Sequence, residues 1–188
     1  DVSRDELQPL LEQQFKGWKG GDVPQKNIAL VGQRAGPTVY LVDRPDSAQS
    51  VIFAGHVAPP KNNEREIAIE AMNEVLGGSF NARINMNLRE DKHWSYGAQS
   101  LLLDAEGQRP FLVYAPVQTD QTSAAMAEIH REVSEIRGER PPTPDEVARA
   151  KDVKTLTLAG QWETADAVAD SLAEMVRIRR FEERCVEL

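Results

Sequence analysis

An α+β fold is predicted for this chain, in which a mixed or antiparallel β-sheet carries helices packed on one face. Three observations favour it. β-rich runs occur in two pairs, segments with helical apolar spacing lie before and between these pairs, and the last third of the chain is helical. A doubly wound parallel fold fits less well, because strands and helices do not alternate singly along the chain.

The first predicted elements are a helix, two strands and a second helix. Residues 5–16 have leucine and phenylalanine at helical spacing. Residues 38–42 and 50–53 are rich in β-branched and aromatic side chains, and a proline-containing turn separates them. Residues 68–76 form an apolar helical face. Gly77 is expected to end that helix in the left-handed conformation that glycine adopts cheaply.

A short helix and two strands are expected next. Phe80, Ile84 and Leu88 recur every four residues, so one face of this helix is predicted to pack inward. The strands are predicted at 96–103 and 110–117, with a glycine-containing turn between them.

Three helices complete the predicted order. The first carries an apolar stripe over 126–136 and ends near Gly138. Thr143-Pro-Asp-Glu146 is a capping box with proline at the first helical position, which is a specific start signal for the second. The last helix is predicted from a stripe formed by Val168, Leu172, Met175 and Val176.

Size and composition describe an ordinary globular chain. Its 188 residues are 40% hydrophobic and 28% charged, and we expect one domain over 1–188. The net charge of −8 argues against nucleic acid as a partner, and no apolar run is long enough for membrane insertion. The single Cys185 excludes an internal disulfide. Because the chain begins at Asp1 without an initiator methionine or leader, we expect it to be a fragment of a longer chain.

Several chemical sites are weakly indicated. Asp91, His93 and Ser95 have the residue types of a catalytic triad, but triads usually draw their members from separate segments. Metal binding would need the distant His56, His93 and His130 to converge, and no zinc motif occurs in the sequence. The sequence therefore predicts no metal site in this chain.

Arg89 and Tyr96 remain as the preferred functional pair. Arg89 follows the last inward position of the predicted helix, and Tyr96 lies seven residues further on. A helix end followed by a strand brings such polar tips to one place. The alternative is structural, with Arg89 in a surface ion pair with Glu90 or Asp91 and Tyr96 half-buried on a strand. Trp94 either packs in the interior or lines a groove, and the sequence leaves both open.

The central stretch resembles the C-terminal domain of the insulinase/pitrilysin family of inverzincin metallopeptidases. The resemblance rests on Leu76-Gly-Gly-Ser-Phe-Asn-Ala-Arg-Ile, on Asn87-Leu-Arg-Glu-Asp and on Tyr96-Gly. Arg83 matches the family's first arginine, Ile84 replaces its usual leucine, and Arg89 and Tyr96 keep the spacing of its later Arg and Tyr. Similar features near Phe15, at Gln49-Ser50 and before the late helices extend the resemblance over nearly the whole chain.

The resemblance implies a division of labour between domains. In such peptidases one half holds zinc through a His-x-x-Glu-His motif, and the other half lacks it and supplies an Arg/Tyr pair to the substrate. By this resemblance, Arg89 and Tyr96 contact the substrate and the transition state at a zinc site elsewhere, and Trp94 is a further substrate-binding candidate. Zinc is then expected in a partner domain or subunit, and an extended peptide is the expected substrate.

This chain departs from a complete enzyme because it carries no zinc motif, so it is expected to be inactive by itself. A second reading from the same family is a non-catalytic scaffold or interaction subunit. A third possibility is that the missing part of this same chain carries its own zinc motif. The family resemblance also suggests a bacterial periplasmic or envelope location.

Overall fold

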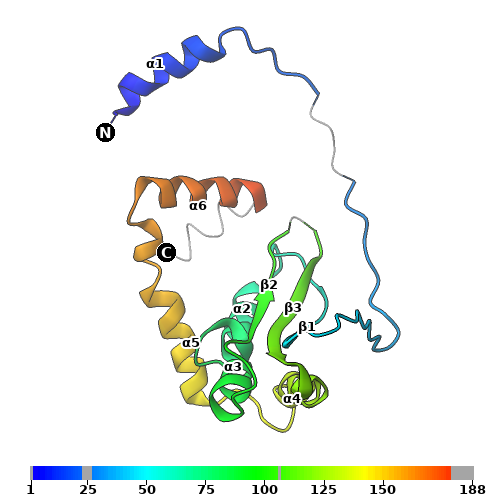
Figure 1. The fold of residues 1–188 in the computed structure, drawn as a ribbon. Helices are drawn as coiled ribbons and strands as arrows, with labels where there is room; N and C mark the ends of the chain where they lie inside the picture. The colour runs from blue at the N-terminus through cyan, green and yellow to red at the C-terminus, as the bar shows by residue number, and fades with distance from the viewer. Residues whose placement is uncertain (1, 23–26, 106, 179–188) are drawn as a thin grey trace.

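The computed structural model describes residues 2–22, 27–105 and 107–178, and the side chains of 176–178 are left undescribed. Its centre is a three-stranded antiparallel sheet with helices on one face, which confirms the predicted α+β class (Figure 1). The strand order is β1-β3-β2. The strands are β1 (Gln49–Ala58), β2 (Gln99–Leu102) and β3 (Arg109–Gln118).

The strand β3 lies in the middle of the sheet. It pairs along its whole length with β1, so that Gln49 lies opposite Gln118 and Ala58 lies opposite Arg109. The shorter β2 pairs with the other side of β3, with Gln99 opposite Tyr114. Among the described residues, the second edge of β1 has no paired strand.

The helices nearest the sheet build the hydrophobic core. The helix α4 packs on β1 and β3, and α2 and α3 pack near β2. Alternate residues of β3 point into this layer, including Val113, Ala115 and Val117. The elements on this face are α2 (Glu66–Asn73), the π-helical turn η1 (Glu74–Gly78), α3 (Arg83–Asn85), the π-helical turn η2 (Met86–Asp91), the 3-10 turn η3 (Thr119–Gln121) and α4 (Thr122–Glu135).

The last helices are α5 (Pro144–Leu156) and α6 (Ala165–Ile178), joined through the 3-10 turn η4 (Gly160–Trp162). The predicted capping box is confirmed. Thr143 Oγ1 accepts a hydrogen bond from the Glu146 N–H, and the Glu146 carboxylate accepts one from the Thr143 N–H. In α6 the predicted Met175 is buried, Leu172 is 41% exposed, and the side chain of Val176 lies outside the described residues.

The N-terminal helix α1 (Arg4–Phe15) stands apart from the sheet in Figure 1. Ser3 caps it, and none of its residues is buried. Residues 27–48, which we call the arm, then lead to β1. The strand predicted at 38–42 is wrong for this structure, because these residues are exposed and form no ladder. β-branched composition favours an extended chain, but a strand also needs a hydrogen-bonded neighbour.

The expected left-handed glycine at position 77 is also wrong. No described glycine has a positive φ, and the helix continues through Gly77 as the π-helical turn η1. A Cβ atom at Gly77 would lie 2.5 Å from the Ser100 N and 2.6 Å from its Oγ. Glycine is therefore required here because the helix approaches β2 closely, not because of its own dihedral angles.

Three boundaries differ from the sequence prediction around the central stretch. Ile84 and Leu88 are buried as expected, but Phe80 precedes α3 and is 56% exposed. The predicted short helix is divided into three α-helical residues and a π-helical turn. The strand predicted at 96–103 is shorter, because β2 begins at Gln99, so Tyr96 lies in the preceding turn.

A buried ion pair joins the sheet to α2. Arg109 is 1% exposed, and its guanidinium contacts the carboxylate of Glu66 and the backbone oxygen of Pro59. It also donates to Asp104, which pairs with Lys61. This cluster fixes one end of the helix layer against the sheet. Within the described part of the chain, no helix has both the length and the apolar character needed to cross a membrane.

Candidate functional site

The backbone beside Arg89 and Tyr96 is held together by one carbonyl group. The Leu88 carbonyl oxygen accepts hydrogen bonds from the N–H of Trp94 at 2.9 Å and from the N–H of Ser95 at 3.3 Å. The chain makes the required reversal at His93, whose φ is 57°. Arg89 follows Leu88 and Tyr96 follows Ser95. The structure thus bonds the residues that precede Arg89 and Tyr96, and among the described contacts none joins the two side chains directly.

The turn that carries Tyr96 is anchored on both sides. Before it, the Ser95 hydroxyl donates to the Pro116 carbonyl at 2.6 Å and accepts from the Gly97 N–H at 3.1 Å. After it, the Asn85 Oδ1 accepts from the Ala98 N–H at 3.0 Å. The Tyr96 side chain itself is 87% exposed. A fixed backbone therefore presents the phenol to solvent.

Arg89 lies on the π-helical turn η2 with a partly exposed side chain. Its Nε is 3.2 Å from the Glu90 carboxylate, which is one of the surface ion pairs considered from the sequence. Its guanidinium carbon also lies 4.6 Å from the centre of the Phe80 ring. An exposed ion pair of this kind contributes about 0–1 kcal/mol. The guanidinium therefore remains free to exchange Glu90 for another acceptor.

Trp94 is half-buried and packs against the hydrophobic core. Its carbonyl oxygen accepts from the Gln118 N–H at 2.9 Å, and the Lys92 ammonium lies 5.1 Å from its ring centre. Of the two possibilities left open by the sequence, the structure shows the indole of Trp94 packed against the interior. That Trp94 also contacts a substrate stays a prediction.

The other chemical candidates do not assemble. The Ser95 hydroxyl is engaged by Pro116 and Gly97, and the His93 Nδ1 lies 3.0 Å from the Arg89 carbonyl oxygen. The structure gives Asp91 no bond to either side chain, so these three residues form no triad within the described chain. In the residues the structure describes, no three His, Cys, Asp or Glu side chains gather closely enough to hold a metal ion.

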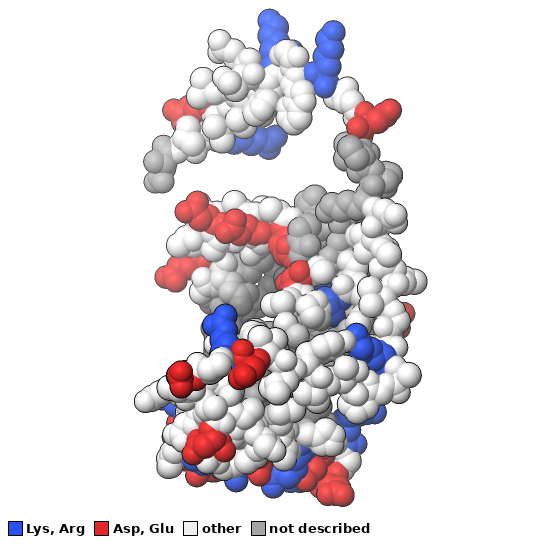
Figure 2. All heavy atoms as spheres, turned by 45° about the vertical axis from the view of Figure 1, so that its right-hand side comes forward, with Lys and Arg blue, Asp and Glu red and all other residues white. Residues whose placement is uncertain are grey.

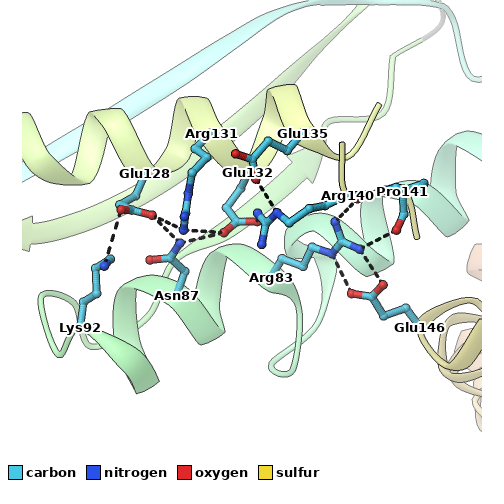
Figure 3. A network of polar contacts seen from close by, with 10 residues as sticks. All are labelled: Arg83, Asn87, Lys92, Glu128, Arg131, Glu132, Glu135, Arg140, Pro141 and Glu146. Carbon is cyan, nitrogen blue, oxygen red and sulfur yellow. Dashed lines mark hydrogen bonds and ion pairs between the residues drawn. The ribbon is translucent and has the colours of Figure 1, made fainter. Parts of the chain in front are cut away.

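Arg83, the other arginine of the sequence motif, holds two helices together (Figure 3). Its Nε and Nη2 donate to the two carboxylate oxygens of Glu146, and it also donates to the carbonyl oxygens of Arg140 and Pro141. The hydrogen bonds from Arg83 lower the pKa of Glu146 to about 2, and further hydrogen bonds from Thr143 act in the same direction. Arg83 thus joins α3 to the start of α5.

A second group of charged side chains continues this network along α4 (Figure 3). The Asn87 amide donates to Glu128 at 2.8 Å and to Glu132 at 2.7 Å. Glu132 is buried and also accepts from Arg140, while Arg131 pairs with Glu128. All of these residues except Glu128 line an open depression of about 720 Å³. Because their charges are already paired with one another, the network serves packing between helices.

The anchoring roles of Asn85 and Ser95 were missed by reasoning from the sequence, which considered Ser95 only as a member of a triad. Ser95 acts through Pro116, twenty-one positions away, and Asn85 acts through Ala98, thirteen positions away. Neither contact has a local signal, because Ser95 bonds to Pro116 on β3, and Asn85, at the end of α3, bonds to the backbone just before β2. One feature of the sequence did point to Asn85. It is a polar residue next to the inward-facing Ile84, and a buried amide needs a hydrogen-bond partner.

The fold is similar to that of several solved structures. An inactive domain of peptidase M16 from Pseudomonas fluorescens superimposes with a TM-score of 0.78 at 18% identity, over 100% of this chain and 44% of that one. A protease from Helicobacter pylori gives a TM-score of 0.81 at 17% identity, over 94% of this chain and 43% of that one. A chain of complex III2 from Candida albicans gives 0.64 at 14% identity, over 95% and 43%. The chain thus spans less than half the length of each of these structures.

The family comparison agrees with the structural one. No curated protein matches the chain. The family model described as the peptidase M16 inactive domain matches residues 1–154, and the assignment to a zinc-free domain of insulinase/pitrilysin type is thereby confirmed. The chain belongs to the peptidase M16 family, of which it carries the inactive domain.

Proposed function

We propose that this chain is the substrate-binding domain of a zinc-dependent endopeptidase, and that it supplies Arg89 and Tyr96 to a zinc site carried by another domain or subunit. The observation that carries the proposal is the pair of hydrogen bonds to the Leu88 carbonyl from Trp94 and Ser95, because it fixes the turn between Arg89 and Tyr96. The exposed phenol on an anchored turn supports it, because a donor must be preplaced to act in catalysis.

The two side chains have complementary chemical roles. Hydrolysis of a peptide bond at zinc develops negative charge on the oxygen of the scissile carbonyl. The Tyr96 hydroxyl donates a hydrogen bond to that oxygen or to the adjacent peptide group. The Arg89 guanidinium, which has five N–H donors, holds a substrate carbonyl and orients the tyrosine. The substrate in this proposal is an extended peptide.

The test of the Arg89 role uses the complete enzyme that contains this domain and its zinc-bearing partner. Arg89→Ala is expected to lower kcat/KM for peptide hydrolysis by roughly a hundredfold, because it removes a charged donor from the transition state. Arg137→Ala is the matched control, since Arg137 is also exposed and follows α4 rather than lying on η2. Equal hydrolysis by the wild type and both variants would overturn the proposal.

A structural subunit is the second candidate function. The likeness to a chain of complex III2 favours it, although at 14% identity that likeness concerns the fold alone. The two functions differ in what they require of Tyr96 and Arg89. A structural subunit retains its assembly with partners when both residues are replaced, and it has no peptide hydrolysis to lose.

A further inference from the structure

The arm is attached to both ends of β1. Near the C-terminal end of β1, the Gln33 amide donates to the Val57 carbonyl oxygen. At the other end, Thr119 donates to the carbonyl oxygens of Ser47, at 2.7 Å, and Ala48, at 3.4 Å. The arm therefore begins beside one end of β1 and returns to the other. In Figure 1 it descends alongside the sheet before it turns into β1.

Between these attachments the arm exposes four consecutive apolar residues. Val39, Tyr40, Leu41 and Val42 are between 70% and 87% exposed. The backbone of 38–42 makes no backbone hydrogen bond to another described residue. Figure 2 brings this side of the molecule forward, and much of its surface is uncharged. Such a run in solvent is unusual, because exposed apolar surface normally marks a binding site.

The neighbouring edge of β1 is unpaired as well. β1 is ten residues long and bonds to β3 along only one side in the described structure. The side chains of Val51 and Phe53, which alternate with the buried Ile52, are more than half exposed. A long, apolar, unpaired edge is a template for another strand, and proteins usually cover such an edge.

We propose that the free edge of β1 is a strand-docking surface whose occupant is residues 37–42 of the same chain, paired as a fourth, antiparallel strand. The connection 43–48 already contains a turn, in which the Ser47 N–H donates to the Arg44 carbonyl oxygen and Asp46 has a φ of 62°.

The attachments also define the register of this pairing. A connection of 43–48 sets Val42 opposite Gln49 and Thr38 opposite Phe53. The same register sets Gln33 opposite Ala58, which is next to the Val57 that Gln33 contacts. The arm thus approaches β1 in the order and direction that a hairpin needs.

The docked segment covers the edge that an extended peptide would use for strand addition. A peptide can pair with β1 only after residues 37–42 have dissociated from its edge, so the arm blocks strand addition there. This inference concerns the sheet edge alone and does not depend on the roles of Arg89 and Tyr96.

Disulfide trapping tests the register. In a Cys185→Ser background, one variant carries Thr38→Cys with Phe53→Cys, and the matched control carries Val39→Cys with Phe53→Cys. A paired strand directs residues 38 and 53 to the same face and residue 39 to the opposite face. With oxidised glutathione, the first pair is expected to form its intrachain disulfide at least tenfold faster than the control. Equal rates would show a loose arm, and interchain disulfides alone would show a second copy at the edge; either result overturns the proposal.

Amide hydrogen exchange of the unmodified chain provides a second measurement that needs no cysteine variant. In this register the amides of residues 38, 40 and 42 face β1, because the odd-numbered residues of β1, such as Val57, face the free edge. The amides of 38 and 42 are expected to exchange at least tenfold more slowly in the unmodified chain than in a Tyr40→Pro variant, because proline at position 40 removes a ladder donor and disfavours pairing. The proposal fails if 38–42 exchanges at the same rate in both chains. It also fails if only the edge amides of β1 are protected, since another occupant would then cover them.

Discussion

The guanidinium of Arg83 holds the carboxylate of Glu146 through two parallel hydrogen bonds, Nε to Oε1 and Nη2 to Oε2, each 2.7 Å long. The two residues are sixty-three positions apart. The same carboxylate completes the capping box of α5. One bidentate pair therefore connects the central stretch to the helix that follows the core.

Replacement of Arg83 by alanine should destabilise the domain. The change leaves a partly buried carboxylate and two carbonyl oxygens without their donor, and we expect a loss of about 2–3 kcal/mol in the free energy of unfolding. Urea denaturation measures this. Arg137→Ala, at an exposed position, should change the free energy by less than about 0.5 kcal/mol. Indistinguishable urea midpoints for the two variants would show that the pair contributes no stability.

The Glu146 carboxylate also predicts how stability depends on pH. Its pKa in the folded chain, about 2, is lower than its ordinary value of 4.5. The stabilisation is present above pH 4.5 and is lost as the pH falls towards 2, because the unfolded chain takes up the proton first. The difference in unfolding free energy between the wild type and Glu146→Gln should therefore shrink over this interval. A difference that stays constant from pH 6 to about pH 2 would contradict the predicted titration.

Gly77→Ala tests the close approach of η1 to β2. The new Cβ atom would meet backbone as well as side-chain atoms of Ser100, so the neighbouring strand must shift. We expect a loss of about 1–3 kcal/mol in unfolding free energy. Gly138→Ala is the control, because nothing lies within 4 Å of a Cβ at that position. Thermal denaturation that gives the same midpoint for both variants would argue against the close contact.

The buried ion pair of Arg109 and Glu66 should be more sensitive than a surface pair. Arg109→Leu leaves the Glu66 carboxylate buried without its cation, which typically costs about 3–5 kcal/mol. Lys154→Leu removes an exposed partner of Glu70 and should cost less than about 1 kcal/mol. Equilibrium unfolding of both variants makes the comparison, and equal losses would contradict the burial of Arg109.

The sequence predicted those elements whose signals are local. The capping box at Thr143 and the periodic apolar stripe over 126–136 depend on residues within a few positions of one another. The capping box is observed, and in the stripe Ile129 and Ile136 are buried while Met126 is exposed. The strand predicted at 38–42 is not observed, because β composition does not supply a hydrogen-bonding partner. At Gly77 the glycine was recognised but its reason was not, since the constraint comes from Ser100 on another element.

For the candidate site, too, the sequence predicted the local features and not the contacts between distant residues. The spacing of Arg89 and Tyr96 is visible in the sequence, and the family resemblance singles it out. The contacts that fix the turn between them are not visible there. The Leu88 carbonyl accepts from Trp94 and Ser95 only once the chain reverses at His93, and the Ser95 hydroxyl donates to Pro116, which lies on the distant strand β3. The structural alternative, in which Tyr96 is half-buried on a strand, is wrong, because the ring is 87% exposed in the turn before β2.

The most direct test of the proposed function is the turnover of Tyr96→Phe in the complete zinc-containing enzyme, compared with wild type and with Tyr40→Phe, which alters another exposed tyrosine. Because the Tyr96 phenol is exposed, the variant should keep its unfolding free energy within about 0.5 kcal/mol of wild type. Its kcat for peptide hydrolysis should fall by about a hundredfold or more, as expected when a transition-state donor is removed. A kcat close to those of wild type and Tyr40→Phe would contradict the assignment of Tyr96 to catalysis.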